Sequence, residues 1–263
     1  MSDDRSLLLE AVAEVARLAG KVALGYFKSG LTVETKSDGS PVTIADRAAE
    51  DAARSWIASH FPDDAVEGEE RGANTVTSHR RWIIDPIDGT KTFVRGVPLW
   101  GSLVAVCEGN EVIAGAASFP AVGEELAAAI ERGAWWNGVR CSVSSVDSMP
   151  DATVLTTNPQ FRLTPDFKPS WDRLAGAARM ARGWGDCYGY LLVATGRAEV
   201  MVDGILADWD AAALYPAIVE AGGVFTDRSG RRTPFGKSAI ATNANLATEA
   251  RRLLDVPLAP EKE

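Results

Sequence analysis

The stretch best suited to chemistry spans residues 82–90, with the sequence Trp-Ile-Ile-Asp-Pro-Ile-Asp-Gly-Thr. Three bulky apolar residues before Asp85 predict a buried strand that ends near Pro86, because proline cannot donate to a central ladder. Asp88 follows three residues later, and a turn there lets both carboxylates and the Ile87 carbonyl converge. These are hard oxygen ligands of the kind that Mg²⁺ or Mn²⁺ prefers. The stretch therefore predicts either a metal site or an Asx-turn that only ends a strand.

The two residues after Asp88 are suited to hold a phosphate. Gly89 and Thr90 follow the turn, where a new helix is expected to begin. The first backbone amides of a helix have no partner within it and point toward anions. A phosphate bound there would lie directly beside the predicted metal ligands.

Three further acidic residues have ordinary structural explanations as well as functional ones. Asp46 has the spacing of a capping box with Thr43, which would open a helix to about residue 60. Glu69 lies in an acidic segment beside a glycine, and such segments are usually solvated loops. Asp210 stands at the start of an apolar helix, where aspartate is a common N-cap. Only their combination with the central stretch indicates a metal site.

Length and composition describe an ordinary globular chain. It has 263 residues, 46% hydrophobic and 24% charged, enough for one large domain or two small ones. A net charge of −9 argues against a nucleic-acid partner. Charged residues in the N-terminal segment predict neither a signal peptide nor a membrane span, and three cysteines without metal-site spacing indicate free thiols. We expect a cytoplasmic protein without a membrane partner.

Hydrophobic periodicity predicts an α+β chain in two halves, residues 1–145 and 146–263. The first half is expected to hold two helices, at about 8–29 and 43–60, the central strand, and an antiparallel meander at 99–107, 112–118 and 125–130. Residues 133–138 are expected to form a turn, and 142–150 a crossing between the halves. The second half should alternate strands at 153–157, 198–202, 224–226 and 239–242 with helices at 171–182, 188–195, 210–221 and 246–254.

Three motifs, taken in order, resemble the inositol monophosphatase family. They are Gly68-Glu69-Glu70, then Asp85-Pro86-Ile87-Asp88-Gly89-Thr90, then Trp209-Asp210-Ala211-Ala212 followed by Glu220-Ala221-Gly222-Gly223. The resemblance spans residues 7 to about 245 and includes the two signature motifs of the family. It implies a layered αβαβα sandwich of the inositol monophosphatase/sugar phosphatase type, with an antiparallel sheet in the N-terminal half and an α/β C-terminal half. It also implies hydrolysis of a small phosphorylated metabolite.

The resemblance implies a set of metal ligands. Glu69, Asp85 and the Ile87 carbonyl would hold one Mg²⁺, and Asp85, Asp88 and Asp210 a second. A third, weaker site would use Glu69 and water, and Mn²⁺ would be a substitute. Such cations clamp a phosphate and lower the pKa of a bound water. A homodimer and inhibition by Li⁺ at the Asp88/Asp210 site are implied in the same way.

The resemblance also implies catalytic roles. Thr90 and Asp46 would form a dyad that orients and deprotonates the attacking water, with Glu69 as the third catalytic residue. The amides of Gly89 and Thr90 would hold phosphate oxygens, beside Asp88 and Asp210. Glu70 would lie behind the ligands, in contact with the residues that bind metal.

Rival phosphatase chemistries fit the spacing poorly. A haloacid-dehalogenase enzyme has its nucleophile two residues before the aspartate of Asp-Gly-Thr, whereas Asp85 stands three before Asp88. No cysteine has an arginine six residues later, as a cysteine-phosphatase loop requires. Two histidines, His60 and His79, are too few for a histidine-rich binuclear site.

The segment 185–190, Gly-Asp-Cys-Tyr-Gly-Tyr, resembles the histidinol-phosphate phosphatase branch, as does 91–100. Asp186 stands where inositol-cleaving members have small neutral residues, and Asp203 matches an acidic substrate-binding position. Two acids suit a ligand that ends in an ammonium and an imidazole. The structural alternative for Asp186 is an N-cap before Tyr188. Inositol 1-phosphate or a related sugar phosphate is the alternative substrate, and a catalytically silent binding protein is the alternative function.

Overall fold

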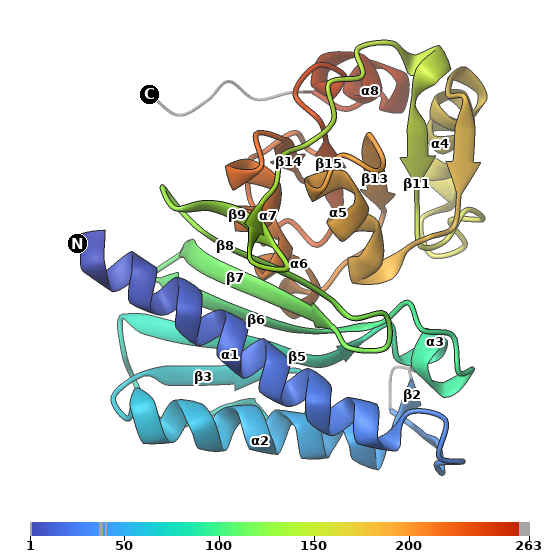
Figure 1. Cartoon of the computed structure of the whole chain (residues 1–263). Helices are drawn as coiled ribbons and strands as arrows, with labels where there is room; N and C mark the ends of the chain where they lie inside the picture. The colour runs from blue at the N-terminus through green and yellow to red at the C-terminus, as the bar shows by residue number, and fades with distance from the viewer. Residues whose placement is uncertain (1, 37–38, 40, 258–263) are drawn as a thin grey trace.

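Two large β-sheets and three layers of helices alternate in the computed structural model, which describes residues 2–36, 39 and 41–257 (Figure 1). The first layer is α1 (Ser2–Tyr26) and α2 (Ile44–His60), which cover one face of the larger sheet. The middle layer is α5 (Asp186–Ala194), α6 (Asp208–Ala212) and α7 (Leu214–Glu220), between the two sheets. The last layer is α4 (Lys168–Ala177) and α8 (Ala247–Leu254), on the far face of the smaller sheet.

The larger sheet has eight strands in the order β10-β9-β8-β7-β6-β5-β3-β4. They are β3 (Ala65–Gly68), β4 (Gly72–Ala73), β5 (Arg80–Asp88), β6 (Gly101–Glu108), β7 (Glu111–Phe119), β8 (Glu124–Ala129), β9 (Gly133–Trp136) and β10 (Val139–Arg140). All neighbours are antiparallel except β3 and β5, which are parallel. The predicted meander is confirmed. The predicted turn at 133–138 is confined to residues 137–138, because Gly133–Trp136 pair with β8 as a fourth meander strand.

The smaller sheet has the order β12-β11-β13-β15-β14 and mixes both directions. Its strands are β11 (Thr153–Leu155), β12 (Met180–Arg182), β13 (Val200–Asp203), β14 (Val224–Thr226) and β15 (Ala239–Thr242). The helix predicted over 171–182 ends at Ala177, because residues 180–182 pair with β11 in parallel register. The helix predicted over 210–221 is split into α6 and α7 at Ala213, whose backbone packs directly against Gly115.

Short elements complete the chain. They are β1 (Glu34–Thr35), β2 (Pro41–Val42), α3 (Thr90–Val94) and the 3₁₀ turns η1 (Met149–Asp151) and η2 (Pro165–Phe167). In Figure 1, α3 lies at one end of the larger sheet, beside β2. Within the described ranges, no helix is both long and apolar enough to cross a bilayer. The three cysteines, Cys107, Cys141 and Cys187, are free thiols.

The core crosses the boundary between the two halves. One hydrophobic cluster joins Leu103 of β6 with Leu191 of α5, Ile218 of α7 and Phe225 of β14, all almost completely buried. Each such side chain stabilises the fold by about 1.5–3 kcal/mol. The middle helix layer is therefore held by both sheets, and the residues at its edges are fixed relative to β5.

Candidate metal centre and active site

Three carboxylates converge at the end of β5. Asp85 and Asp88 stand at a register irregularity, where Asp85 pairs with Leu103 and Asp88 with Gly101. Asp210 reaches the same place from the first turn of α6. One oxygen from each of the three carboxylates lies within 4.8 Å of the others. The strand irregularity thus turns both β5 carboxylates toward the aspartate of the middle layer, as the sequence predicts.

The structural alternatives for these residues are also present. Asp85 Oδ1 accepts a hydrogen bond from the Ile87 amide at 3.0 Å, which is an Asx-turn. Asp210 Oδ2 accepts one from the Ala207 amide at 2.9 Å, which caps α6. A carboxylate accepts several hydrogen bonds, so each turn bond occupies only part of its capacity. The local bonds orient the side chains and leave oxygen lone pairs for a cation.

The electrostatics of the cluster favour a bound cation. Burial, with repulsion from Glu69 and the neighbouring aspartates, raises the pKa of Asp85 well above its ordinary value. Burial and repulsion from Asp186 and Asp210 do the same to Asp88. Burial raises the pKa of Asp210 to about 6. Since all donors are hard oxygens and their charges repel, the residues fit Mg²⁺.

Glu69 is held next to this cluster by a lysine. Lys36 Nζ lies 2.7 Å from Glu69 Oε1 and also contacts Glu70. Burial lowers the pKa of Lys36, but the two carboxylates outweigh it and hold that pKa above its ordinary value. The role of Lys36 could not be predicted from sequence, because nothing in its polar loop indicates a contact with Glu69, 33 residues later. Glu70 lies behind Glu69, as expected, but its partner is this lysine.

Glu50 is a second residue that sequence reasoning missed. Its side chain is fully buried in α2 and accepts hydrogen bonds from the amides of Glu70 at 2.7 Å and Arg71 at 3.1 Å. A Cβ on Gly68 would overlap the Glu50 carboxylate. Glu50 therefore fixes the backbone that carries Glu69. A buried glutamate within the apolar face of the predicted 43–60 helix was the available signal.

Thr90 and Asp46 meet at the start of α3. Gly89 precedes the helix with φ 84°, a left-handed conformation that glycine adopts without strain. The Thr90 hydroxyl lies 2.9 Å from the Ile87 carbonyl and 3.4 Å from Asp46 Oδ1. Asp46 Oδ2 accepts from the amide and the hydroxyl of Thr43, both at 2.7 Å. One oxygen of Asp46 thus forms the predicted cap, and the other faces Thr90. Burial raises the pKa of Asp46.

Asp186 lies beside the start of α3. It is the first residue of α5, and Gly185 occupies the N-cap position without a side-chain bond. Asp186 Oδ2 accepts a hydrogen bond from the Thr92 hydroxyl at 3.1 Å and lies 3.1 Å from where a Cβ on Gly89 would stand. The Asp186 carboxylate therefore faces the helix start predicted to hold phosphate, and it does not cap its own helix.

Asp203 is placed differently from Asp186. It ends β13 and is only 4% exposed. Its two oxygens accept hydrogen bonds from the Thr157 amide at 3.1 Å and the Tyr190 hydroxyl at 3.0 Å. Burial raises the pKa of Asp203 to about 7. Each oxygen thus accepts one hydrogen bond from the protein.

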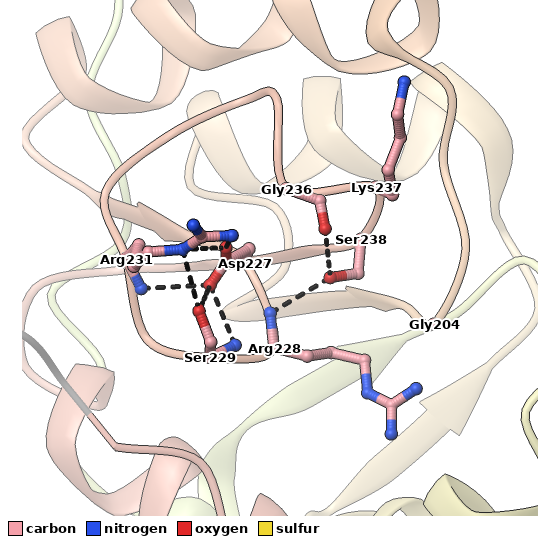
Figure 2. Close-up of a pocket in the computed structure, with 8 residues that line it drawn as sticks. All are labelled: Gly204, Asp227, Arg228, Ser229, Arg231, Gly236, Lys237 and Ser238. Carbon is pink, nitrogen blue, oxygen red and sulfur yellow. Dashed lines mark hydrogen bonds and ion pairs between the residues drawn. The ribbon is translucent and has the colours of Figure 1, made fainter.

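A separate hollow of about 390 Å³ is lined in part by Gly204, the residue after Asp203 (Figure 2). Its lining includes Arg228, Arg231 and Lys237 but no member of the acid cluster. Figure 2 shows Arg231 turned onto Asp227 and Ser229. The three cations pair with Asp166, Asp227 and Asp208. The charges of this hollow are balanced within the protein.

The αβαβα layers, the converging carboxylates and the adjoining helix start define a metal-dependent phosphomonoesterase. The chain belongs to the inositol monophosphatase family, whose model matches residues 4–256. The members of this family are magnesium-dependent and act on small phosphate esters.

Relatives and solved structures agree with this assignment. The chain is 43% identical to the histidinol-phosphatase of Chlorobaculum parvum over 89% of its own length and 92% of the relative. It is 39% identical to the histidinol-phosphatase of Mycobacterium tuberculosis, covering 95% and 97%. The structure of the extragenic suppressor protein suhB from Bartonella henselae has a TM-score of 0.88 at 27% identity, covering 94% and 98%. The predicted family and fold class are confirmed.

Proposed function

We propose that this protein hydrolyses L-histidinol phosphate to L-histidinol and phosphate, a step of histidine biosynthesis. The placement of Asp186 carries the proposal. Its carboxylate faces the start of α3, adds to the charge that raises the pKa of Asp88, and forms no ion pair with any described residue. A substrate cation is a suitable partner for such a carboxylate. The histidinol-phosphatases among the relatives support the same substrate.

Asp85, Asp88 and Asp210, with Glu69 and the Ile87 carbonyl, are proposed to hold Mg²⁺. When bound, Mg²⁺ neutralises phosphate charge and lowers the pKa of a water that attacks phosphorus directly. The backbone amides of Gly89 and Thr90 bind phosphate oxygens at the start of α3. These groups are common to every phosphate ester and do not select the alcohol.

Thr90 and Asp46 are proposed to move the proton of the attacking water. The Thr90 hydroxyl has two acceptors, the Ile87 carbonyl at 2.9 Å and Asp46 Oδ1 at 3.4 Å. A hydroxyl carries one proton, so it donates fully to Asp46 only when its bond to Ile87 weakens. In that orientation the oxygen of Thr90 accepts a proton from water while its own proton passes to Asp46. Burial raises the pKa of Asp46, which makes it a better proton acceptor.

Inositol 1-phosphate is the second candidate substrate. The chain is 30% identical to the inositol monophosphatase of Thermotoga maritima, whose structure has a TM-score of 0.84 and is covered over 97% of its length. An inositol ring offers hydroxyl groups, which form weaker bonds to a carboxylate than an ammonium does. Asp186 therefore favours the cationic substrate.

The test is a phosphate-release panel on wild type and Asp186→Ala. The panel contains histidinol phosphate, inositol 1-phosphate, fructose 1,6-bisphosphate and glycerol 2-phosphate, an ester without an amine. Asp186→Ala should lower kcat/KM on histidinol phosphate by an amount equivalent to roughly 2–4 kcal/mol of activation free energy. The kcat/KM on glycerol 2-phosphate should stay almost unchanged. Asp166→Ala, which removes an exposed acid paired with Arg228, is the matched control. A wild type that prefers inositol 1-phosphate would assign the function to the second candidate.

A further inference from the structure

The backbone of Asp186 has an unusual conformation. Its φ is 50°, in the left-handed region that favours glycine. A non-glycine residue keeps such a conformation only where neighbouring groups hold it, and such residues gather at functional sites. The direction of the Asp186 carboxylate depends on this backbone conformation. The groups that hold the backbone therefore also aim the carboxylate.

Thr157 holds the Asp186 backbone. It lies two residues beyond the end of β11, and its hydroxyl oxygen accepts a hydrogen bond from the Asp186 amide at 2.8 Å. Gly185, the preceding residue, packs so closely that a Cβ there would overlap the Thr157 backbone. One threonine thus contacts two consecutive residues at the start of α5. It fixes both the position and the rotation of the Asp186 peptide.

Thr157 is in turn held by Asp203. The Thr157 amide donates to Asp203 Oδ1 at 3.1 Å, while the Tyr190 hydroxyl donates to Asp203 Oδ2 at 3.0 Å. Asp203 is 4% exposed, and each of its two oxygens accepts one of these hydrogen bonds. A continuous path of hydrogen bonds therefore runs from Asp203 through Thr157 to Asp186.

We propose that Thr157 is a positioning residue that aims Asp186 at the cation of the substrate. Asp203 holds the backbone amide of Thr157. This inference rests on the proposed function, in which Asp186 binds the cationic end of histidinol phosphate. Selectivity for a cationic ester then depends on the hydroxyl of Thr157, which accepts the hydrogen bond from the Asp186 amide.

The start of α5 has a second anchor, which separates selectivity from metal binding. The Cys187 amide donates a hydrogen bond to Asp88 Oδ2, and this bond does not involve Thr157. Removal of the Thr157 hydroxyl therefore leaves the contact with the metal-ligand strand in place. Metal affinity and activity on an amine-free ester should be preserved in such a variant.

The experiment compares Thr157→Val, which removes the hydroxyl at nearly constant size, with Thr157→Ser, which retains it. Thr157 is exposed, so both variants should fold. Thr157→Val should lower kcat/KM on histidinol phosphate about tenfold and change that on glycerol 2-phosphate less than about twofold. Thr157→Ser should stay near wild type on both. Equal losses on the two esters, or equal losses in the two variants, would overturn the proposal.

A double-mutant cycle tests whether Thr157 acts through Asp186. In an Asp186→Ala background, Thr157→Val should cause no further loss on histidinol phosphate, because the group that it aims is absent. Additive losses would contradict the positioning role.

A measurement without substrate separates this inference from the proposed function. Hydrogen exchange of the Asp186 amide should be faster in Thr157→Val than in wild type, and unchanged in Thr157→Ser. Unchanged exchange in Thr157→Val would overturn the positioning role whatever the substrate. A wild type that does not prefer histidinol phosphate, with faster exchange in Thr157→Val, would instead reject the proposed function and keep the structural path.

Discussion

The backbone amide of Cys187 donates a hydrogen bond to Asp88 Oδ2, which joins the first turn of α5 to the end of β5. The two residues are 99 positions apart. The bond orients Asp88 within the acid cluster and fixes the residue next to Asp186. One contact therefore sets the distance between the group that is proposed to bind metal and the group that is proposed to bind substrate.

The acid cluster predicts unequal effects of two conservative substitutions. Asp85 is buried at the centre of the cluster, whereas Glu70 contacts Lys36 behind it. Asp85→Asn should weaken Mg²⁺ binding at least about 100-fold and abolish measurable turnover, while Glu70→Gln should weaken it about tenfold or less. Titration calorimetry with Mg²⁺ gives both dissociation constants. Equal losses would mean that Glu70 is itself a metal ligand.

Sequence was sufficient for the parts of the site that lie within one motif. Asp85 and Asp88 share a strand end, and the strand irregularity that turns them together follows from the Pro-Ile-Asp-Gly sequence. The antiparallel meander could be predicted because its residues follow a simple period. Strand β12 could not, since Met180 and its neighbours become a strand only by pairing with β11.

Contacts between distant residues could not be found in this way. The burial of Glu50, the placement of Lys36 at Glu69 and the path from Asp203 to Asp186 all depend on how the layers pack. The homodimer, the cytoplasmic location and inhibition by Li⁺ stay predictions.

Thr90 gives a prediction that separates catalysis from metal binding. Its hydroxyl lies within hydrogen-bonding distance of Asp46 and the Ile87 carbonyl. Thr90 is not one of the three residues whose carboxylates cluster. Thr90→Ala should lower kcat about 100-fold with a nearly unchanged Mg²⁺ dissociation constant, while Thr90→Ser should retain most activity. Single-turnover kinetics at saturating Mg²⁺ measure the effect. If a higher Mg²⁺ concentration restored the activity of Thr90→Ala, the proton-transfer role would be rejected.

The raised pKa values predict how metal binding couples to stability. Asp210 has a pKa of about 6 in the folded protein, compared with about 4 in an unfolded chain. The metal-free folded state thus binds this proton more tightly, so stability is lost as the pH rises from about 4 to 6. Asp85 and Asp88, whose pKa values are also raised, extend the loss to higher pH.

Bound Mg²⁺ should cancel this loss, because it stabilises the ionised carboxylates. In EDTA, the melting temperature should fall between pH 5.5 and pH 8. A Mg²⁺ concentration 100 times the dissociation constant adds about 2.7 kcal/mol, a shift of about 5–10 °C for a chain of this size. The shift should be much smaller at pH 5.5 at the same concentration, with Na⁺ at matched ionic strength as the control. A pH-independent shift would contradict the assignment of these carboxylates.

The final prediction concerns Glu50, which never reaches the acid cluster. Its carboxylate accepts hydrogen bonds from the amides of Glu70 and Arg71, and it leaves no room for a Cβ on Gly68. Glu50 thereby fixes the segment that carries Glu69. Glu50→Gln keeps the size of the side chain but replaces one acceptor oxygen with a donor that faces an amide.

We expect Glu50→Gln to weaken Mn²⁺ binding about 10- to 100-fold, as for other residues that orient metal ligands. Gly68→Ala should act in the same direction, because its methyl group displaces the carboxylate. Glu67→Gln is the matched control, since Glu67 shares the segment but pairs at the surface with Arg81 at 2.8 Å. Electron paramagnetic resonance of free Mn²⁺ measures all three affinities. If Glu50→Gln binds Mn²⁺ as tightly as Glu67→Gln does, the buried carboxylate serves only the stability of α2, and the position of Glu69 is set by Lys36.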